Sequence, residues 1–289
     1  MHVIKTKDGF GHLQQMTIKD IQEVSLEILK DVHDFCMAND IRYTLQGGTL
    51  LGAIRHQGFI PWDDDIDIAM PRPDYERFIR SYHSEKGYKV FSRELPSPAP
   101  EVYLAFSRVC DMERTFVDYR NLEWTSAETG VWIDVFPLDG IPDDKSERNN
   151  HFNRMYVLWK KYHSLRFANR PFSWNRKLKT KIVWFITQFR RPFLSYKMID
   201  EHIKLCQSVK YGETASYIQA AFMGYGMKEV HRVNVLGETV LKKFEGYDFC
   251  VMAGYDEALR EKYGNYMKLP PVEQRVNHHG GRYYWKDQK

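Results

Sequence analysis

The chain has 289 residues, of which 43% are hydrophobic and 15% aromatic, so it can bury a large core and does not have the composition of a disordered polypeptide. No apolar run is longer than five residues, and the first residues lack the apolar segment of a signal peptide, so we expect a cytoplasmic protein without a membrane-spanning helix. The cysteines are far apart in sequence, which excludes a disulfide scaffold and a zinc ribbon and is typical of a reducing compartment: Cys36, Cys110, Cys206 and Cys250.

The net charge of +4 is unevenly distributed. Residues 148–199 contain 13 Lys and Arg and no Asp or Glu, which leaves 29 of the 42 basic residues for the rest of the chain against all 38 acidic ones. Aromatic residues alternate with the basic ones, and such segments are drawn to anionic lipid. We expect peripheral contact with an anionic membrane, at the inner membrane face. The alternatives are polyanion binding and a basic helical face that is only solvated; a nucleic-acid partner is not expected.

The hydrophobic pattern predicts helices and strands in an irregular order. The first 16 residues have no clear pattern and form an expected N-terminal arm, after which Thr17 and Asp20 form a capping box for an amphipathic helix over 18–38. Further along we expect strands over 41–45, 65–70, 103–110, 114–119, 131–136 and 244–251, and helices over 49–55, 73–87, much of 144–222 and 254–263. The fold class is therefore α+β: a mixed-sheet core over 17–142, a basic, aromatic-rich helical region over 143–230, and a C-terminal segment over 231–289.

An acidic run, Pro61-Trp-Asp-Asp-Asp-Ile-Asp, places four carboxylates within five positions. In an extended chain Asp65 and Asp67 share one face, where two carboxylates repel each other unless a cation lies between them. Carboxylate oxygens favour Mg²⁺ or Mn²⁺. The alternative is an acidic loop that caps the following helix, which suits Asp63 and Asp64 well, and short D-x-D matches also arise by chance.

Two other features strengthen the metal hypothesis. Gly47, Gly48 and Thr49 open a helix, where backbone N–H groups can approach a phosphate, although an ordinary strand-to-helix turn has the same pattern. Asp134 is a single carboxylate inside an apolar strand, and a buried carboxylate is costly unless it is paired. Its partner is either the cation or one of two arginines, Arg108 or Arg55.

The stretch from Gly47 to Phe78 resembles the signature of the LicD family of phosphotransferases, which is similar in its core to fukutin and fukutin-related protein and has the nucleotidyltransferase fold. The segments Trp132–Gly140 and Tyr263–His279 agree with this family, and the resemblance covers about residues 20–285. The cysteine set that binds zinc in fukutin-related protein is absent, so no structural zinc is expected.

The resemblance implies transfer of a phospho-alcohol, phosphocholine above all, from a CDP-activated donor to a sugar hydroxyl of a cell-surface glycan or its lipid-linked precursor, with CMP as the leaving group. Asp65 and Asp67 would hold Mg²⁺ (or Mn²⁺) against the diphosphate. Asp134 would complete the metal site and draw the proton from the attacking hydroxyl. The last segment of the chain, 231–289, would complete the active site.

Further residues are candidates for ligand contact. For the nucleotide and its phosphates they are Gly47, Gly48, Thr49, Arg55, Arg72 and Arg275. For the head group or the acceptor they are Trp62, Trp132, Asp139, His278 and His279. The alternatives are a structural partner for the aspartates (Arg55), a turn before Gly140 (Asp139) and packing of the C-terminal tail on the core; a metal site at the paired histidines is rejected.

Other functions remain open at this point. The same carboxylates would serve transfer of phosphoethanolamine, glycerol phosphate, ribitol phosphate or a phosphonate. A D-x-D metal-dependent glycosyltransferase is a rival, but only 64 residues precede Asp65, fewer than a nucleotide-binding half of that fold usually needs. A phosphatase fits poorly, and a glycan-binding module would not need three carboxylates.

Overall fold

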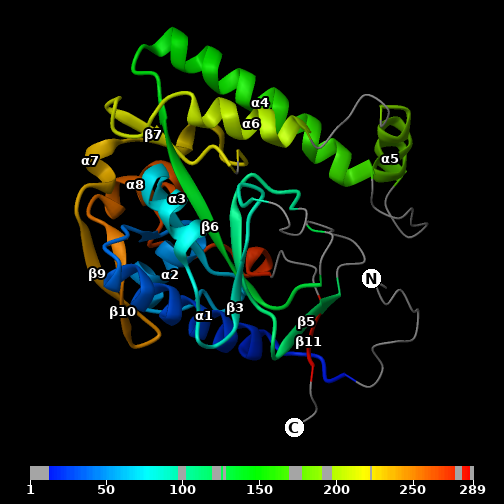
Figure 1. The fold of residues 1–289 in the computed structure, drawn as a ribbon, viewed down its shortest axis with the longest axis vertical. Helices are drawn as coiled ribbons and strands as arrows, with labels where there is room; N and C mark the ends of the chain where they lie inside the picture. The colour runs from blue at the N-terminus through cyan, green and yellow to red at the C-terminus, as the bar shows by residue number, and fades with distance from the viewer. Residues whose placement is uncertain are drawn as a thin grey trace.

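The computed structural model describes residues 13–96, 102–118, 125, 128–168, 178–190, 197–221, 223–276 and 282–286. Within them the chain folds into a mixed β-sheet covered by helices, with a helical layer at one end (Figure 1). The α+β class expected from the sequence is confirmed.

The central sheet has the strand order β1-β2-β6-β4-β3. These strands are β1 Thr44–Leu45, β2 Asp67–Pro71, β6 Trp132–Ile141, β4 Ser107–Asp111 and β3 Tyr88–Phe91. Only β2 and β6 run parallel within this order; the other neighbours are antiparallel. The last residues of β6 pair instead with β7 Ser216–Ile218, which pairs with β8 Val230–Arg232.

The first helix, α1 Ile18–Ala38, has the predicted bounds and the predicted capping box between Thr17 and Asp20. Its apolar stripe, which includes Ile21 and Ile28, is buried where the helix packs on β4 and β6. Two shorter helices, α2 Gly47–His56 and α3 Arg72–Ser81, pack on β2, and α3 also packs on β6.

The basic region forms three helices, α4 Lys145–Ala168, α5 Leu178–Arg190 and α6 Lys197–Gln207. Helices α4 and α6 lie side by side, whereas α5 lies beyond the end of α4, away from the sheet (Figure 1). A small second core joins α4 and α6 to the end of β6, and it consists of Ile141, Met155, Cys206, Ile218, Ala220 and Met223.

The C-terminal part returns to the sheet. It contains η2 Gly226–Glu229, α7 Val233–Leu236, the hairpin β9 Thr239–Phe244 and β10 Tyr247–Met252, α8 Tyr255–Tyr263, η3 Val272–Gln274 and β11 Arg282–Trp285. Strand β11 pairs with β5 Thr115–Asp118, and the N–H of Met16 donates to the carbonyl of Tyr283 at 2.8 Å. The two ends of the described chain therefore pack together.

Several expected bounds were wrong. The helical stretch predicted over 144–222 contains β7, and the strand predicted over 244–251 is the second half of a hairpin. Strand β6 continues five residues past the predicted end at 136 because it exchanges β4 for β7 as its antiparallel partner. Among the described residues, no helix has both the length and the apolar character needed to cross a bilayer.

Candidate active site

Three charged side chains form a row across the middle of the sheet. The register pairs Asp67 of β2 with Asp134 of β6, and Asp134 with Arg108 of β4. Register partners on neighbouring strands carry their side chains on the same face. The structure therefore brings Asp67 and Asp134 together, 67 residues apart in the sequence, through the parallel pairing of β2 and β6.

Asp65 joins this row from the loop that precedes β2, not from inside a strand as expected. Burial raises the pKa of Asp65 well above its usual range, and the charges of Asp67, Asp63 and Asp134 raise it further. All three predicted metal ligands thus act on one another electrostatically. The arrangement concentrates negative charge at one point of the sheet.

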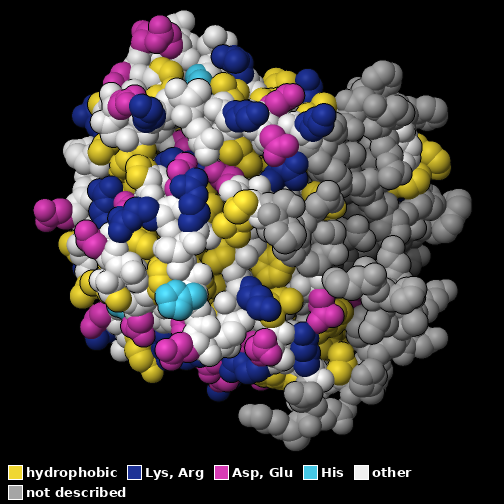
Figure 2. All heavy atoms as spheres, viewed as in Figure 1, with side chains coloured by type: hydrophobic (Ala, Val, Ile, Leu, Met, Phe, Trp, Pro, Cys, Tyr) yellow, Lys and Arg dark blue, Asp and Glu magenta, His cyan; other side chains and the backbone are white. Residues whose placement is uncertain are grey.

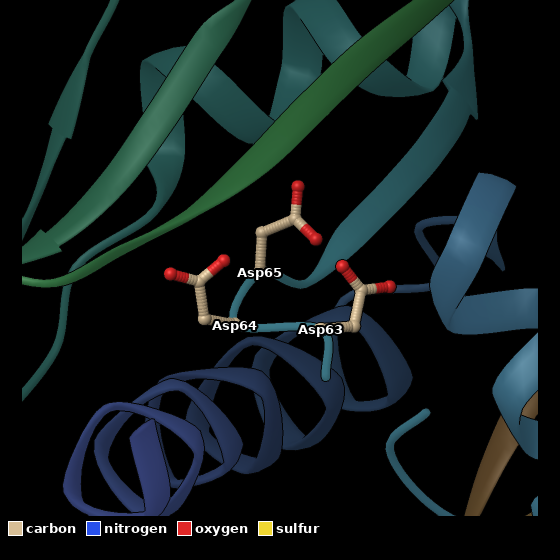
Figure 3. A group of neighbouring side chains, drawn as sticks. All are labelled: Asp63, Asp64 and Asp65. Carbon is tan, nitrogen blue, oxygen red and sulfur yellow. The ribbon is translucent and has the colours of Figure 1, made fainter. Parts of the chain in front are cut away.

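Figure 3 shows the adjoining carboxylates of the loop, Asp63, Asp64 and Asp65, above α1. One oxygen of each lies within 4.8 Å of the others. Asp63 and Asp64 were expected to cap the following helix, but a strand follows them, and Asp63 lies instead against the start of the preceding helix, α2.

The two glycines of α2 make room for these carboxylates. A Cβ on Gly47 would lie 2.9 Å from Oδ2 of Asp67, and one on Gly48 would lie 2.6 Å from Oδ2 of Asp63. Gly47 also has a φ of +58°, which side chains rarely adopt. The hydroxyl of Thr49 accepts a hydrogen bond from the N–H of Asp67 at 2.8 Å. The N-terminus of α2 therefore faces the acidic cluster directly.

Asp65 and Asp134 border one pocket, with an empty volume of about 290 Å³. It is lined by Ile21, Asp64, Asp65, Arg108, Val131, Trp132, Asp134 and Tyr283. The rings of Trp132 and Tyr283 are 5.5 Å apart. Sequence reasoning missed Tyr283, because only the pairing of β11 with β5 places it there; the alternating pattern Arg-Tyr-Tyr-Trp was the one available signal.

Asp134 has the arginine partner that the sequence left as an alternative. Nε of Arg108 lies 2.6 Å from Oδ1 of Asp134, and the second guanidinium nitrogen lies 3.3 Å from Oδ2. The guanidinium of Arg108 also lies over the ring of Trp132, 4.3 Å from its centroid. Burial of Asp134 is thus explained without a metal, and its carboxylate is held toward the pocket.

Two arginines from opposite ends of the chain meet beside the acidic cluster. Burial and the nearby charge of Arg275 lower the pKa of Arg55, and Arg275 lies over the ring of Trp62 at 5.7 Å. Arg55 donates to the carbonyl of Tyr266 at 2.8 Å, and Arg275 to that of Pro270 at 3.0 Å. Within the part of the chain that the structure describes, neither guanidinium forms an ion pair with a carboxylate.

Arg72 and Asp139, both predicted to contact ligand, bind each other instead. Nε of Arg72 lies 2.6 Å from Oδ1 of Asp139, and its side chain also pairs with Glu94 at 2.9 Å. Asp139 is 1% exposed and lies inside β6, five residues beyond Asp134, which is roughly 17 Å along a strand. It is therefore neither a turn residue nor part of the pocket. His278 and His279 lie outside the described residues.

A divalent cation fits the donor set. The converging groups are carboxylate oxygens, which are the ligands that Mg²⁺ and Mn²⁺ prefer. The raised pKa of Asp65 shows that its ionised form is disfavoured among three other carboxylates, a situation that a bound cation would reverse.

Comparison with known proteins identifies the relatives of this fold. A sequence model described as "LicD/FKTN/FKRP, nucleotidyltransferase domain" matches residues 40–173. The lipopolysaccharide cholinephosphotransferase LicD of Haemophilus influenzae is 33% identical over 273 residues, which cover 92% of this chain and 97% of that protein. An uncharacterized protein of Rickettsia prowazekii is 27% identical over 64% of this chain and 74% of its own length.

A shorter match joins the chain to a human enzyme. The ribitol 5-phosphate transferase FKRP of Homo sapiens is 54% identical over 56 residues, which cover 19% of this chain and 11% of that protein. Because the Haemophilus relative is similar over almost its full length, the chain belongs to the LicD family of phosphotransferases.

Proposed function

We propose that the protein transfers a phospho-alcohol group from a CDP-activated donor to a sugar hydroxyl of a cell-surface glycan or its lipid-linked precursor, and releases CMP. The observation that carries this proposal is the convergence of Asp65, Asp67 and Asp134 beside the N-terminus of α2. The names of two relatives support the reaction class, since one is a cholinephosphotransferase and the other a ribitol 5-phosphate transferase.

Arg55 and Arg275 are proposed to bind the diphosphate of the donor. They lie close enough for Arg275 to lower the pKa of Arg55, and an anion between them would remove their mutual repulsion. The N-terminus of α2 adds about half a positive charge on the same side of the acidic cluster.

Asp65, Asp67 and Asp134 would hold Mg²⁺ or Mn²⁺. When bound, the cation would neutralise charge on the phosphate oxygens during in-line displacement. The chain's own part is to position and to take a proton. Arg108 fixes Oδ1 of Asp134 at 2.6 Å and holds Oδ2 more loosely at 3.3 Å, so Oδ2 is the atom proposed to accept the proton of the attacking sugar hydroxyl.

The transferred alcohol is the open part of the proposal. A quaternary ammonium binds over aromatic faces. Arg108 already lies over the ring of Trp132, where a choline cation would meet a like charge. This contact argues against Trp132 as the choline surface and keeps ethanolamine, glycerol and ribitol phosphates as alternatives.

The test is donor turnover by the purified full chain. The protein, Mg²⁺ and a lipopolysaccharide acceptor are incubated separately with CDP-choline, CDP-ethanolamine, CDP-glycerol, CDP-ribitol and a UDP-sugar, and released nucleotide is measured. We expect CMP release from at least one CDP-alcohol, reduced at least about a hundredfold in Asp67→Asn. The control is Asp256→Asn, which changes a carboxylate of α8 that pairs with Arg260.

Two results would contradict the proposal. Release of UDP from the UDP-sugar together with no CMP would assign the chain to the glycosyltransferases. Equal CMP release by Asp67→Asn and wild-type protein would remove the assigned role of the carboxylates.

A further inference from the structure

Helix α5 has an amphipathic pattern that faces the wrong way for a helix of a soluble core. Its apolar residues recur at the spacing i, i+4, i+7 and i+8, and this stripe normally packs on the protein interior. In α5 the stripe is exposed instead: Leu178 is 72%, Ile182 51%, Phe185 52% and Ile186 47% exposed, and neighbouring Val183 is 41% exposed.

The buried side of α5 is the other one. Thr187 is 7% exposed, and Lys181 and Trp184 are partly buried on the side where α5 packs on α4. The helix lies at the outer end of α4, away from the sheet (Figure 1), and hydrophobic atoms are visible at that edge of the surface (Figure 2). The apolar stripe therefore points out of the molecule.

We infer that α5 is a membrane anchor, which inserts its apolar stripe into the interface of an anionic phospholipid bilayer. Charge decides between the occupants. The segment 148–199 that contains α5 has 13 Lys and Arg and no Asp or Glu, so it is attracted to anionic headgroups. A second copy of the chain would bring two such segments together, and like charges would repel. A nucleic acid would match the charge but offers no hydrocarbon for five large apolar side chains.

This inference is independent of the transfer reaction, because none of the residues of α5 belongs to the pocket or the arginine pair. It also gives the expectation of membrane contact a definite element. The helix has 13 residues and lies flat in the interface, so the anchor is peripheral.

The test is co-sedimentation of the full chain with vesicles of phosphatidylcholine alone and of an equal mixture of phosphatidylcholine and phosphatidylglycerol. We expect binding to the mixed vesicles only, weakened by added NaCl. The double variant Ile182→Glu with Phe185→Glu should lower the partition coefficient at least tenfold, because it removes two large apolar side chains from the lipid.

The matched control is Val240→Glu with Leu241→Glu, which changes two side chains of β9 that are 40% and 55% exposed. It should bind as the wild-type protein does. Thermal melting verifies that both variants are folded, and Leu178→Glu replaces the double variant if that one is not. Equal binding by the α5 and β9 variants would overturn the inference, as would absence of wild-type binding at low salt. A concentration-dependent dimer in light scattering that the α5 variant abolishes would also overturn it.

Discussion

Asp65 is a residue whose charge the fold tolerates at a cost. Its folded-state pKa is raised above the ordinary value of about 4, by burial and by Asp67, Asp63 and Asp134. Its contribution to stability is therefore fully present below about pH 4 and is lost as the pH rises through the folded-state pKa. At neutral pH the ionised side chain destabilises the folded protein.

We predict that Asp65→Asn raises the melting temperature at pH 7.5 by about 2–4 °C, the shift that about 1 kcal/mol produces in a domain of this size. The gain should shrink toward zero at pH 4, where the wild-type side chain is protonated. Thermal unfolding by circular dichroism over this pH range, without divalent ions, measures it.

The same variant tests the cation. Mg²⁺ or Mn²⁺ should raise the melting temperature of the wild-type protein more than that of Asp65→Asn, since a ligand stabilises the state that binds it. Asp256→Asn is the control, because the pKa of Asp256 is lowered by its hydrogen bonds to Arg260 and Tyr266, so its removal brings no gain at neutral pH. A lower melting temperature in Asp65→Asn at pH 7.5 would contradict the prediction.

Individual residues of the site differed in how well the sequence predicted them. Asp65, Asp67 and Asp134 were identifiable because the acidic motif and the apolar strand each have a distinct pattern. Arg72 and Asp139 were not, because closeness to a motif in sequence does not say at which end of a strand a side chain lies. Both lie at the far end of the β2–β6 pair, in a buried ion pair.

Among the elements, the start of α2 is the least tolerant of change. Gly47→Ala would place a Cβ 2.9 Å from the carboxylate of Asp67 at a φ of +58°. We predict that it displaces Asp67 and lowers kcat/KM at least tenfold, with a loss of about 1–2 kcal/mol of stability from backbone strain.

Gly246→Ala separates the two causes. Gly246 has a φ of +81° in the turn between β9 and β10, with no atom within 4 Å of an added Cβ. It should lose similar stability and keep its activity, both measured beside Gly47→Ala by steady-state kinetics and denaturant unfolding. Equal activity losses in the two variants would show that strain alone, and not displacement of Asp67, explains the effect.

A second junction of elements is the buried pair of Lys262 in α8 and Glu229 in η2. The two charged atoms are 2.6 Å apart, and the side chains are 9% and 1% exposed. We predict that Lys262→Met costs about 3–5 kcal/mol in urea unfolding, because it leaves a buried carboxylate without its cation. The double variant with Glu229→Gln should recover much of this loss; a cost below about 1 kcal/mol in the single variant would contradict the prediction.

At this scale the sequence predicted α1 and α8 well, since each has a regular apolar stripe and a clear boundary. It missed β3, β7, β8, β9 and β11. These strands are short, and their pairing partners are distant in the sequence, so no local pattern specifies them.

Over the whole molecule, the pocket is assembled from residues between Ile21 and Tyr283. We predict that a chain ending at residue 281, which lacks β11, melts about 5 °C or more below the full chain and has lost CMP release, because Tyr283 and Tyr284 leave the core. A chain ending at residue 286 keeps β11 and should behave as the full chain does. Equal activity of the two shortened chains would show that β11 is dispensable.

The β2–β6 register also has a kinetic consequence. A slip of one residue would turn Asp134 to the opposite side of the sheet from Asp67, so no misaligned or half-formed sheet retains the acidic cluster. After dilution from denaturant, turnover should consequently return no earlier than the native near-ultraviolet signal of the aromatic core. Partly refolded protein would then contribute no slow background reaction, and the enzyme's activity reports directly on the fraction of molecules that have completed the sheet.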